Sequence, residues 1–392
     1  MASDWRELSV GDIADVVGGG TPSTKQEANF NGEIPWITPR DLAGHRYRRI
    51  LRGERNISEQ GLRNSSARLL PRGSVLLTTR APVGYVAIAD GPITTNQGFR
   101  SLVPRDGFSS EFIYYLLKAN TEYLKNYASG TTFGELAGTT LQSLRFRFPL
   151  LPEQGAIAHI LGTLDDKIEL NRRTNQTLEA MAQALFKSWF VDFEPFRDQG
   201  MQDSLMEEIP VGWGVGRLDD LLSLQRGFDL PEVHRTPGKY PVITASGPSG
   251  THAEYKVRGP GVTTGRSGLI GRVFYIHEDF WPLNTSLWVK EFKVSRPIYA
   301  YHLLLSLDFS IFNAGSAVPT LNRNHVHNLP VVIPPVPMVE MFEKLSAPMF
   351  QRCHFNERES STITDIRDVL LPKLLSGEIQ VKGAERFVEK IA

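Results

Sequence analysis

The chain of 392 residues has few of the features that mark secreted or membrane proteins. Its single cysteine excludes an internal disulfide framework and is typical of a reducing compartment. Charged residues begin at Asp4, Arg6 and Glu7, so the start of the chain does not resemble a signal peptide. No apolar run approaches the ~20 residues that a membrane-spanning helix needs. We therefore expect a soluble, cytoplasmic protein with no membrane contact.

Short motifs for common catalytic chemistries are also missing. The sequence has no GxxxxGKS or GxxxxGKT phosphate loop and no GxGxxG after a strand, and its GGGTP stretch at Gly18–Pro22 is interpreted as a turn. It lacks an Asn/Asp-Pro-Pro-aromatic sequence, the usual signature for methylating the amino group of a base. One cysteine cannot form the CxxC pairs of a zinc site, and His325 and His327 have no carboxylate beside them. We therefore expect no catalytic residues, no metal and no cofactor, which favours a binding protein.

The formal net charge is zero, but the basic residues are unevenly distributed. Between positions 40 and 80 the only acidic residues are Asp41, Glu54 and Glu59. Arginine can engage a phosphate, or guanine O6 and N7, through two hydrogen bonds. This segment therefore predicts a DNA-contacting surface, with a solvated basic loop region as the alternative. Its arginines are Arg40, Arg46, Arg48, Arg49, Arg52, Arg55, Arg63, Arg68, Arg72 and Arg80.

Two long charged segments share one heptad pattern and are expected to be helices. They run from Pro152 to Phe190 and from Pro337 to Leu375, with matching positions 185 residues apart. Each has apolar residues every seven positions and an asparagine in the middle slot, which is typical of a coiled-coil seam. We expect the helices to pack on each other; two separate amphipathic helices are the alternative. The predicted seam consists of Ile157, Leu164, Asn171, Leu178 and Leu185 in the first helix, and of Phe342, Met349, Asn356, Ile363 and Leu370 in the second.

The remaining segments also repeat each other. The matches are Trp5 with Trp213, Asp12 with Asp220, Thr78–Arg80 with Thr263–Arg266, Asn96 with Asn284, and Gly130 with Gly315. The offset falls from 208 to about 186, so the first copy carries roughly twenty additional residues, which we place between Thr21 and Arg49. We therefore expect an α+β fold: two similar globular domains joined by two long antiparallel coiled-coil helices in a pseudo-twofold internal repeat.

This organisation divides the chain into five expected segments. They are residues 1–150 (first globular domain), 151–198 (first long helix and linker), 199–336 (second globular domain), 337–380 (second long helix) and 381–392 (C-terminal tail). A helix of about 39 residues is roughly 58 Å long, the axial length of about 17 base pairs. Such a rod would hold two different readers apart over a two-part DNA site with an unread gap.

The order of several motifs in this duplicated frame closely resembles the specificity subunit of type I restriction-modification systems. The resemblance covers essentially the whole chain, and it depends on the order of the motifs because none is decisive alone. The motifs are IPWITPRDL (Ile34–Leu42), PLLPEQGAIAHILGTLDDKIELN at the start of the first long helix, RGFDLP (Arg226–Pro231), GSAVPTLNRNHV (Gly315–Val326) and LLPKLLSGEI (Leu370–Ile379).

The resemblance implies two target recognition domains, each reading half of a bipartite double-stranded DNA site in the major groove. It implies that the long helices set the spacing and dock methyltransferase (modification) and restriction subunits. In this family the modification subunits methylate adenine with S-adenosylmethionine, and the restriction subunits translocate and cleave DNA with ATP and magnesium. The chain is accordingly expected to be a non-catalytic subunit, which agrees with the absence of catalytic motifs.

The resemblance does not identify base-contacting residues, because the recognition loops are the variable part of the family. Chemistry and loop position suggest the following DNA-binding residues: Thr38, Arg40, Arg80 and Asn96 in the first domain, and Arg226, Ser246, Arg266 and Asn284 in the second. Asn96 and Asn284 could equally form turns. Two other functions stay open: an interaction scaffold, such as an orphan or inactive copy that no longer reads DNA, and a self-contained nuclease or methyltransferase with a cryptic site. The missing motifs argue against the latter.

Overall fold

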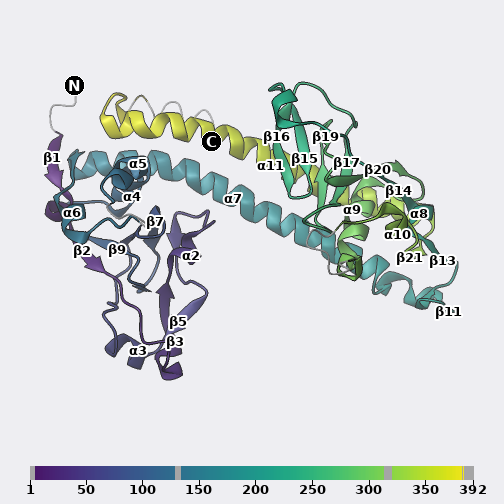
Figure 1. The fold of residues 1–392 in the computed structure, drawn as a ribbon, viewed down its shortest axis with the longest axis horizontal. Coiled ribbons are helices and arrows are strands. Elements are labelled where there is room, and N and C mark those ends of the chain that lie inside the picture. Colours follow the sequence, from purple (N-terminus) through teal and green to yellow (C-terminus); the bar gives the residue numbers. More distant parts are fainter. Residues whose placement is uncertain (1–4, 129–133, 313–319, 382, 384–392) are drawn as a thin grey trace. The chain divides into compact units, whose positions relative to one another are not determined.

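The computed structural model describes residues 5–128, 134–312, 320–381 and 383, which form two compact units (Figure 1). Unit 1 comprises Met1–Asn171 and Arg358–Ala392, and unit 2 comprises Arg172–Glu357. Each unit therefore combines one globular part with a portion of both long helices. Gly130 and Gly315 lie outside the described residues, as does the expected C-terminal tail apart from positions 381 and 383.

The described residues of unit 1 form three sheets. A five-stranded sheet has the order β2-β9-β6-β7-β4, a three-stranded sheet has the order β5-β3-β8, and β1 pairs with β10. The strands are β1 (Arg6–Ser9), β2 (Ala14–Gly18), β3 (Phe30–Ile37), β4 (Arg49–Ile50), β5 (Arg55–Ile57), β6 (Val75–Thr79), β7 (Val83–Ala89), β8 (Thr94–Thr95), β9 (Arg100–Pro104) and β10 (Arg145–Phe148). The short helices are α1 (Val10–Ile13), η1 (Glu27–Asn29), α2 (Pro39–Leu42), α3 (Glu59–Arg63), α4 (Ser110–Ala119), α5 (Thr121–Asn126) and α6 (Gly138–Ser143).

Strand β6 is buried on both faces. Val75 and Leu77 belong to one hydrophobic core, which includes the buried face of α4, whereas Leu76 belongs to a second core with Ile37 of β3. Because successive side chains of a strand point to opposite faces, a strand that is covered on both sides is apolar almost throughout. The strands expected from the sequence runs SVLLTT and YVAIA are confirmed as β6 and β7.

One expected helix, Glu111–Tyr127, is instead the pair α4 and α5. Asn120 separates them with a backbone φ of −104° and ψ of 21°. Its side-chain Nδ2 donates a hydrogen bond to the Leu116 carbonyl at 2.8 Å. Asparagine side chains compete with the helix for backbone hydrogen bonds, so a helix is readily interrupted at such a residue.

In unit 2, the residues that the structure describes form four sheets. They have the orders β14-β20-β17-β18, β16-β15-β19, β13-β21 and β11-β12. The strands are β11 (Met201–Ser204), β12 (Glu207–Pro210), β13 (Gly214–Arg217), β14 (Leu222–Arg226), β15 (Tyr240–Thr244), β16 (Gly247–His252), β17 (Gly261–Gly265), β18 (Val273–Ile276), β19 (Trp281–Pro282), β20 (Ser286–Phe292) and β21 (Pro330–Ile333). The short helices are η2 (Glu194–Gln199), α8 (Leu218–Leu221), η3 (Glu232–His234), α9 (Pro297–Ser306), η4 (Phe309–Phe312) and α10 (Arg323–His327).

The strand orders confirm the internal repeat. The order β2-β9-β6-β7 in unit 1 is matched by β14-β20-β17-β18, β5-β3-β8 by β16-β15-β19, and β1-β10 by β13-β21. Even the parallel pair β3–β8 has its counterpart in β15–β19. Unit 1 adds β4 to the larger sheet, and β4 begins at Arg49, the last residue of the segment in which the additional residues were expected.

Asp12 and Asp220 occupy matching positions in the two repeats and make the same hydrogen bond. Asp12 Oδ2 accepts a hydrogen bond from the Ser9 backbone N–H at 2.9 Å, and Asp220 Oδ2 accepts one from the Arg217 N–H at 2.8 Å. Both carboxylates therefore close the first turn of a short helix, α1 after β1 or α8 after β13. The repeated aspartate is a helix cap, so it needs no functional explanation.

The long helices are α7 (Leu151–Phe190) and α11 (Val336–Ser376), and they run antiparallel within each unit (Figure 1). In unit 1, Asp165 Oδ1 accepts from Arg367 Nη1 at 2.6 Å, and Asn171 Nδ2 donates to Ser360 Oγ at 3.1 Å. In unit 2, Asn356 Nδ2 donates to Asn175 Oδ1 at 2.8 Å. Residues later in α7 thus pair with residues earlier in α11, as an antiparallel arrangement requires.

The residues of the predicted seam lie on the inner side of these helices. Most are buried, and both middle asparagines make hydrogen bonds to the opposite helix within their unit. The buried members are Ile157, Leu164, Asn171, Phe342, Asn356, Ile363 and Leu370, and the partly buried members are Leu178, Leu185 and Met349. A regular knobs-into-holes seam stays a prediction.

Two histidines of unit 2 lie where its globular part packs on the helices. His302 of α9 is only 4% exposed, with its ring centroid 5.6 Å from that of Phe186. His277 stacks on His354 of α11 at 4.3 Å. Burial lowers the pKa of His302 to about 4, and burial together with the neighbouring His354 lowers the pKa of His277 to about 4. Both rings are therefore neutral at pH 7.

The chain is expected to lose stability as the pH falls from 7.5 to 5.5. In the unfolded chain a histidine binds its proton near pH 6.5, whereas folded His302 stays neutral until about pH 4. Protonation of the unfolded chain then lowers the free energy of unfolding by about 1.4 kcal/mol at pH 5.5 through His302 alone. Urea denaturation at both pH values should show this loss in the wild type. In His302→Phe the loss of unfolding free energy between the two pH values should be smaller by that amount. Equal pH dependence in the two proteins would contradict the assignment.

Candidate nucleic-acid interface

Loops from distant parts of unit 1 meet at the turn that follows β8. A Cβ atom built on Gly98 would lie 3.1 Å from Pro39 Cγ and 3.7 Å from the Arg80 carbonyl oxygen. The Asn96 N–H donates to the Ile37 carbonyl at 2.9 Å, and the Thr79 N–H donates to the Gly98 carbonyl at 2.8 Å. The segments that carry Thr38, Arg40, Arg80 and Asn96 therefore form one loop cluster.

The glycine stretch Gly18–Pro22 belongs to the same cluster. The Gly20 N–H donates to the Thr95 carbonyl at 2.9 Å, and Trp36 Nε1 donates to the Gly20 carbonyl at 2.9 Å. A Cβ on Gly19 would lie 1.9 Å from the Asn96 carbonyl oxygen, so only glycine allows this close approach of two backbones. Interpreting the stretch as a turn missed this contact, although the run of three glycines was the available signal.

Unit 2 builds a second loop cluster in the same way. A Cβ on Gly227 would lie 2.2 Å from the Leu283 carbonyl oxygen, and the Phe228 N–H donates to the Pro282 carbonyl at 2.8 Å. Gly227 follows Gly19 by 208 residues, the same offset that separates the two tryptophans at the starts of the repeats. The motif RGFDLP thus occupies the place of the glycine stretch in unit 1.

The segments that carry the other predicted DNA-binding residues of unit 2 lie around this close approach at Gly227. The Arg266 N–H donates to the Thr285 carbonyl at 2.9 Å, and the Ala245 N–H donates to Thr285 Oγ1 at 3.3 Å. The Asn284 N–H donates to the Phe228 carbonyl at 3.1 Å. The segments that carry Arg226, Ser246, Arg266 and Asn284 are therefore adjacent, as their counterparts are in unit 1.

Several predicted residues use their polar groups to hold these loops. Thr38 Oγ1 donates to Asp41 Oδ2 at 2.6 Å, and Asn96 Oδ1 accepts from the Gly98 N–H at 2.9 Å. Asn284 Nδ2 donates to Asp229, and the half-buried Arg266 donates from Nη1 to the Asn284 carbonyl at 3.3 Å. The interpretation of both asparagines as turn residues is therefore consistent with the geometry, and their contact with DNA stays a prediction.

Among the predicted DNA-binding residues, the side chains with the fewest contacts belong to arginines. Arg40 is exposed, and Arg226 is exposed with a 3.4 Å contact to Asp229. Arg80 is 53% exposed, and its nearest acidic group, Glu135, is 3.9 Å away. Ser246 is exposed too, but its hydroxyl lies 2.8 Å from Thr244 Oγ1. Exposed guanidinium groups beside a rigid loop cluster can engage phosphates or base edges.

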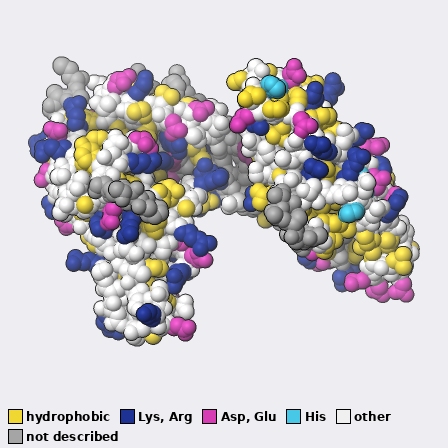
Figure 2. All heavy atoms as spheres, in the orientation of Figure 1, with side chains coloured by type: hydrophobic (Ala, Val, Ile, Leu, Met, Phe, Trp, Pro, Cys, Tyr) yellow, Lys and Arg dark blue, Asp and Glu magenta, His cyan; other side chains and the backbone are white. Residues whose placement is uncertain are grey.

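The arginine-rich stretch divides into structural and exposed members. Arg48 donates to Tyr115 Oη at 3.1 Å and to Asp166 of α7 at 2.7 Å, and Arg55 lies over the Phe30 ring at 4.5 Å. Arg49 and Arg72 form ion pairs with neighbouring carboxylates. Within the described part of the chain, the exposed arginines of this stretch without such partners, or with only the loose contact of Arg80, are Arg40, Arg52, Arg63, Arg68 and Arg80. Figure 2 shows basic and acidic side chains interspersed on the face that it draws.

Neither a metal-binding cluster nor a helix able to span a membrane is found in the described ranges. These ranges contain no cluster of three histidine, cysteine or acidic side chains arranged to hold a metal ion. His327 Nε2 accepts from the Leu224 N–H at 2.8 Å, and His325 stacks on Phe312, so these two rings have separate packing roles. No helix in the same ranges combines the length and apolar composition needed to cross a bilayer.

Comparison with known proteins agrees with this duplicated architecture. Residues 2–180 and 210–347 match the family described as the type I restriction modification DNA specificity domain. The chain is 38% identical over 418 residues to the type I restriction enzyme MjaIX specificity subunit of Methanocaldococcus jannaschii, covering 97% of this chain and 95% of that protein. It is 24% identical over 475 residues to the HindI specificity subunit of Haemophilus influenzae, covering 96% and 100%. A solved type I restriction-modification S subunit from M. genitalium has the same fold, with a TM-score of 0.66, 18% identity and coverage of 94% and 96%.

The chain belongs to the type I restriction-modification DNA specificity family. It is a specificity subunit with two target recognition domains, a non-catalytic component of such a system. The two matched regions correspond to the two structural repeats, so the α+β fold expected from the sequence is confirmed. The residues that contact DNA and the five segment boundaries stay predictions.

Gly19→Ala tests the close approach within the first loop cluster. The new methyl group meets a backbone oxygen that cannot move independently, so the free energy of unfolding should fall by about 2 kcal/mol or more. Gly155→Ala in α7 is the matched control, because a Cβ there meets nothing within 4 Å and alanine favours a helix. Urea denaturation of both variants measures the difference. A Gly19→Ala variant as stable as the wild type would show that the loops do not pack this closely.

Proposed function

We propose that this subunit, assembled with modification subunits, binds double-stranded DNA at a bipartite site, with each loop cluster contacting one half. The observation that carries the proposal is the duplicated loop cluster. Gly19 and Gly227 hold equivalent loops together in two units of the same topology, yet the exposed side chains differ. Equivalent scaffolds that present different side chains suit two halves of different sequence.

Exposed arginines supply the chemistry for binding DNA. In unit 1 they include Arg40, Arg68 and Arg80, and in unit 2 they include Arg226 and Arg272. Arginine neutralises phosphates and reads guanine in the major groove, so some of these side chains position the duplex while others specify bases. Each phosphate contact releases counterions, and affinity should therefore fall steeply as the salt concentration rises.

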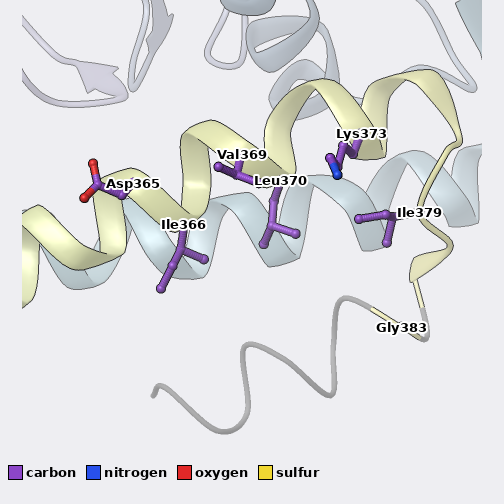
Figure 3. Close-up of a pocket in the computed structure, with 7 residues that line it drawn as sticks. All are labelled: Asp365, Ile366, Val369, Leu370, Lys373, Ile379 and Gly383. Atoms are coloured by element: carbon purple, nitrogen blue, oxygen red, sulfur yellow. The ribbon is translucent and has the colours of Figure 1, made fainter.

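The long helices are proposed to dock the modification subunits. Their outer sides expose large apolar residues, including Leu170 and Met181 of α7 and Leu345, Phe355 and Val369 of α11. In unit 1 an apolar groove of about 420 Å³ lies beside the C-terminal part of α11 (Figure 3). Its lining residues are Asp365, Ile366, Val369, Leu370, Lys373, Ile379 and Gly383. Such exposed apolar side chains and the groove are available for contacts with a partner subunit.

The proposal leaves the chemistry to the partner subunits. Modification subunits would use S-adenosylmethionine to methylate adenine, and restriction subunits would use ATP and magnesium to translocate and cleave DNA. We assign no cofactor to this chain. Because such a complex acts on cellular DNA, we place it in the cytoplasm.

A methylation map tests the function. The chain is expressed with its modification subunit in a host without adenine methylation, and modified adenines are located by single-molecule sequencing. We expect one bipartite motif with a methylated adenine in each half. Arg226→Ala should change or weaken only one half of that motif, because Arg226 lies in the second loop cluster.

Two outcomes would contradict the proposal. A stable complex that methylates no defined motif would indicate a scaffold that does not read DNA. Methylation by the purified chain alone would indicate a catalytic site in this subunit.

A further inference from the structure

Arg80 has a rigid backbone and a loosely held side chain. It follows β6 directly, where the Thr79 carbonyl accepts from the Leu136 N–H at 2.9 Å. Arg80 itself forms an antiparallel bridge with Glu135. The hydrogen bonds of Thr79 and the bridge to Glu135 thus hold the backbone at Arg80, while its side chain is 53% exposed. A fixed backbone with a free guanidinium limits the conformational entropy that binding would cost.

Glu135 is shared between two arginines. Its Oε2 lies 3.9 Å from Arg80 Nη1, a distance too long for a hydrogen bond. Its Oε1 lies 3.4 Å from Arg100 Nη2, and Arg100 is also anchored through a hydrogen bond from Nη1 to the Phe99 carbonyl at 2.9 Å. When Arg80 turns toward a ligand, Arg100 still compensates the Glu135 carboxylate, so little is lost on release.

The matched arginine of unit 2 has a different role. Arg266 is half-buried, and its Nη1 donates to the Asn284 carbonyl at 3.3 Å within its own loop cluster. Its carbonyl also accepts from the Leu321 N–H at 2.7 Å. Two residues at equivalent positions in the sequence repeat are therefore a free side chain in unit 1 and a structural side chain in unit 2.

We propose that Arg80 reads a guanine in the half-site bound by unit 1, while Arg266 only supports its loop. The proposal rests on the DNA-binding function proposed above. Guanine presents the acceptors O6 and N7 on its major-groove edge, and the planar fork of arginine matches them with two hydrogen bonds. The other polar side chains at this point, Thr38 and Asn96, already use their oxygens within the protein.

The test uses the complete methyltransferase complex and duplexes that carry the mapped site. Each guanine is replaced in turn by the other bases, and methylation rates are compared. Arg80→Ala should reduce discrimination at one guanine roughly 10-fold to 100-fold and leave the other half of the site unchanged. Arg80→Lys keeps the charge but not the planar fork, so it should show the same loss of discrimination. Glu135→Gln should leave discrimination at that guanine nearly unchanged, because Arg80 leaves this carboxylate when it turns toward the DNA.

Arg72→Ala is the matched control. Arg72 is 70% exposed and pairs with Asp90 at 3.1 Å, but it precedes β6 whereas Arg80 follows it. The two arginines thus lie beyond opposite ends of one five-residue strand, which is itself about 17 Å long. Arg72→Ala should leave the base preference at every position of the site unchanged. Arg266→Ala should lower the free energy of unfolding without reducing discrimination at any one base.

Three results would overturn the inference. The first is a unit 1 half-site without guanine, and the second is an unchanged motif in Arg80→Ala. The third is a uniform loss of methylation in Arg80→Ala that Arg80→Lys restores, which would make Arg80 a phosphate contact. In all three the wild-type complex still methylates a bipartite site. A wild-type complex with no defined motif would instead refute the proposed function itself.

Discussion

The structure depends above all on the antiparallel packing of α7 against α11, which each unit secures by different chemistry. In unit 1 the ion pair of Asp165 with Arg367 is largely buried, and Tyr115 of α4 donates to the same aspartate at 2.8 Å. Burial alone would lower the pKa of Arg367, but its hydrogen bonds with Asp165 and Asp368 raise it. A buried pair is tolerated only when its remaining hydrogen bonds are satisfied, and removal of one partner typically costs about 3–5 kcal/mol. In unit 2 aromatic rings of α7, α9 and α11 fill the corresponding space.

This frame explains how the loops of each cluster can be held together without being hydrophobic. Each small sheet places its loops against the turn that precedes β9 or β20, and Gly19 or Gly227 lets two backbones touch there. The loop backbones are satisfied by their own hydrogen bonds, so exposed side chains can vary without loss of the scaffold. That separation between a constant frame and variable side chains suits a subunit whose task is to specify a DNA sequence.

Sequence periodicity was sufficient for the largest elements and insufficient for the site. The heptads predicted α7 and α11 to within a residue or two, because a long amphipathic helix leaves a pattern that packing rarely overrides. The offset of 208 residues predicted the repeat, and Asp12 and Asp220 kept it visible because both cap a helix. Which arginines are free could not be predicted, since Arg48 and Arg80 look alike in the sequence. Only the fold brings Asp166 to one and leaves the other exposed.

The central claim is that the two loop clusters, rather than the helices, contact the DNA. Hydrogen–deuterium exchange of the complete methyltransferase complex, with and without a duplex that carries its mapped site, tests this most directly. The account predicts slower exchange on DNA binding around residues 19–21, 39–41, 80 and 96–98, and around residues 226–229, 245–247, 266–268 and 284–286. Amides in the middle of α7 and α11 should be unaffected. Protection confined to the two helices, with both loop clusters unchanged, would contradict it.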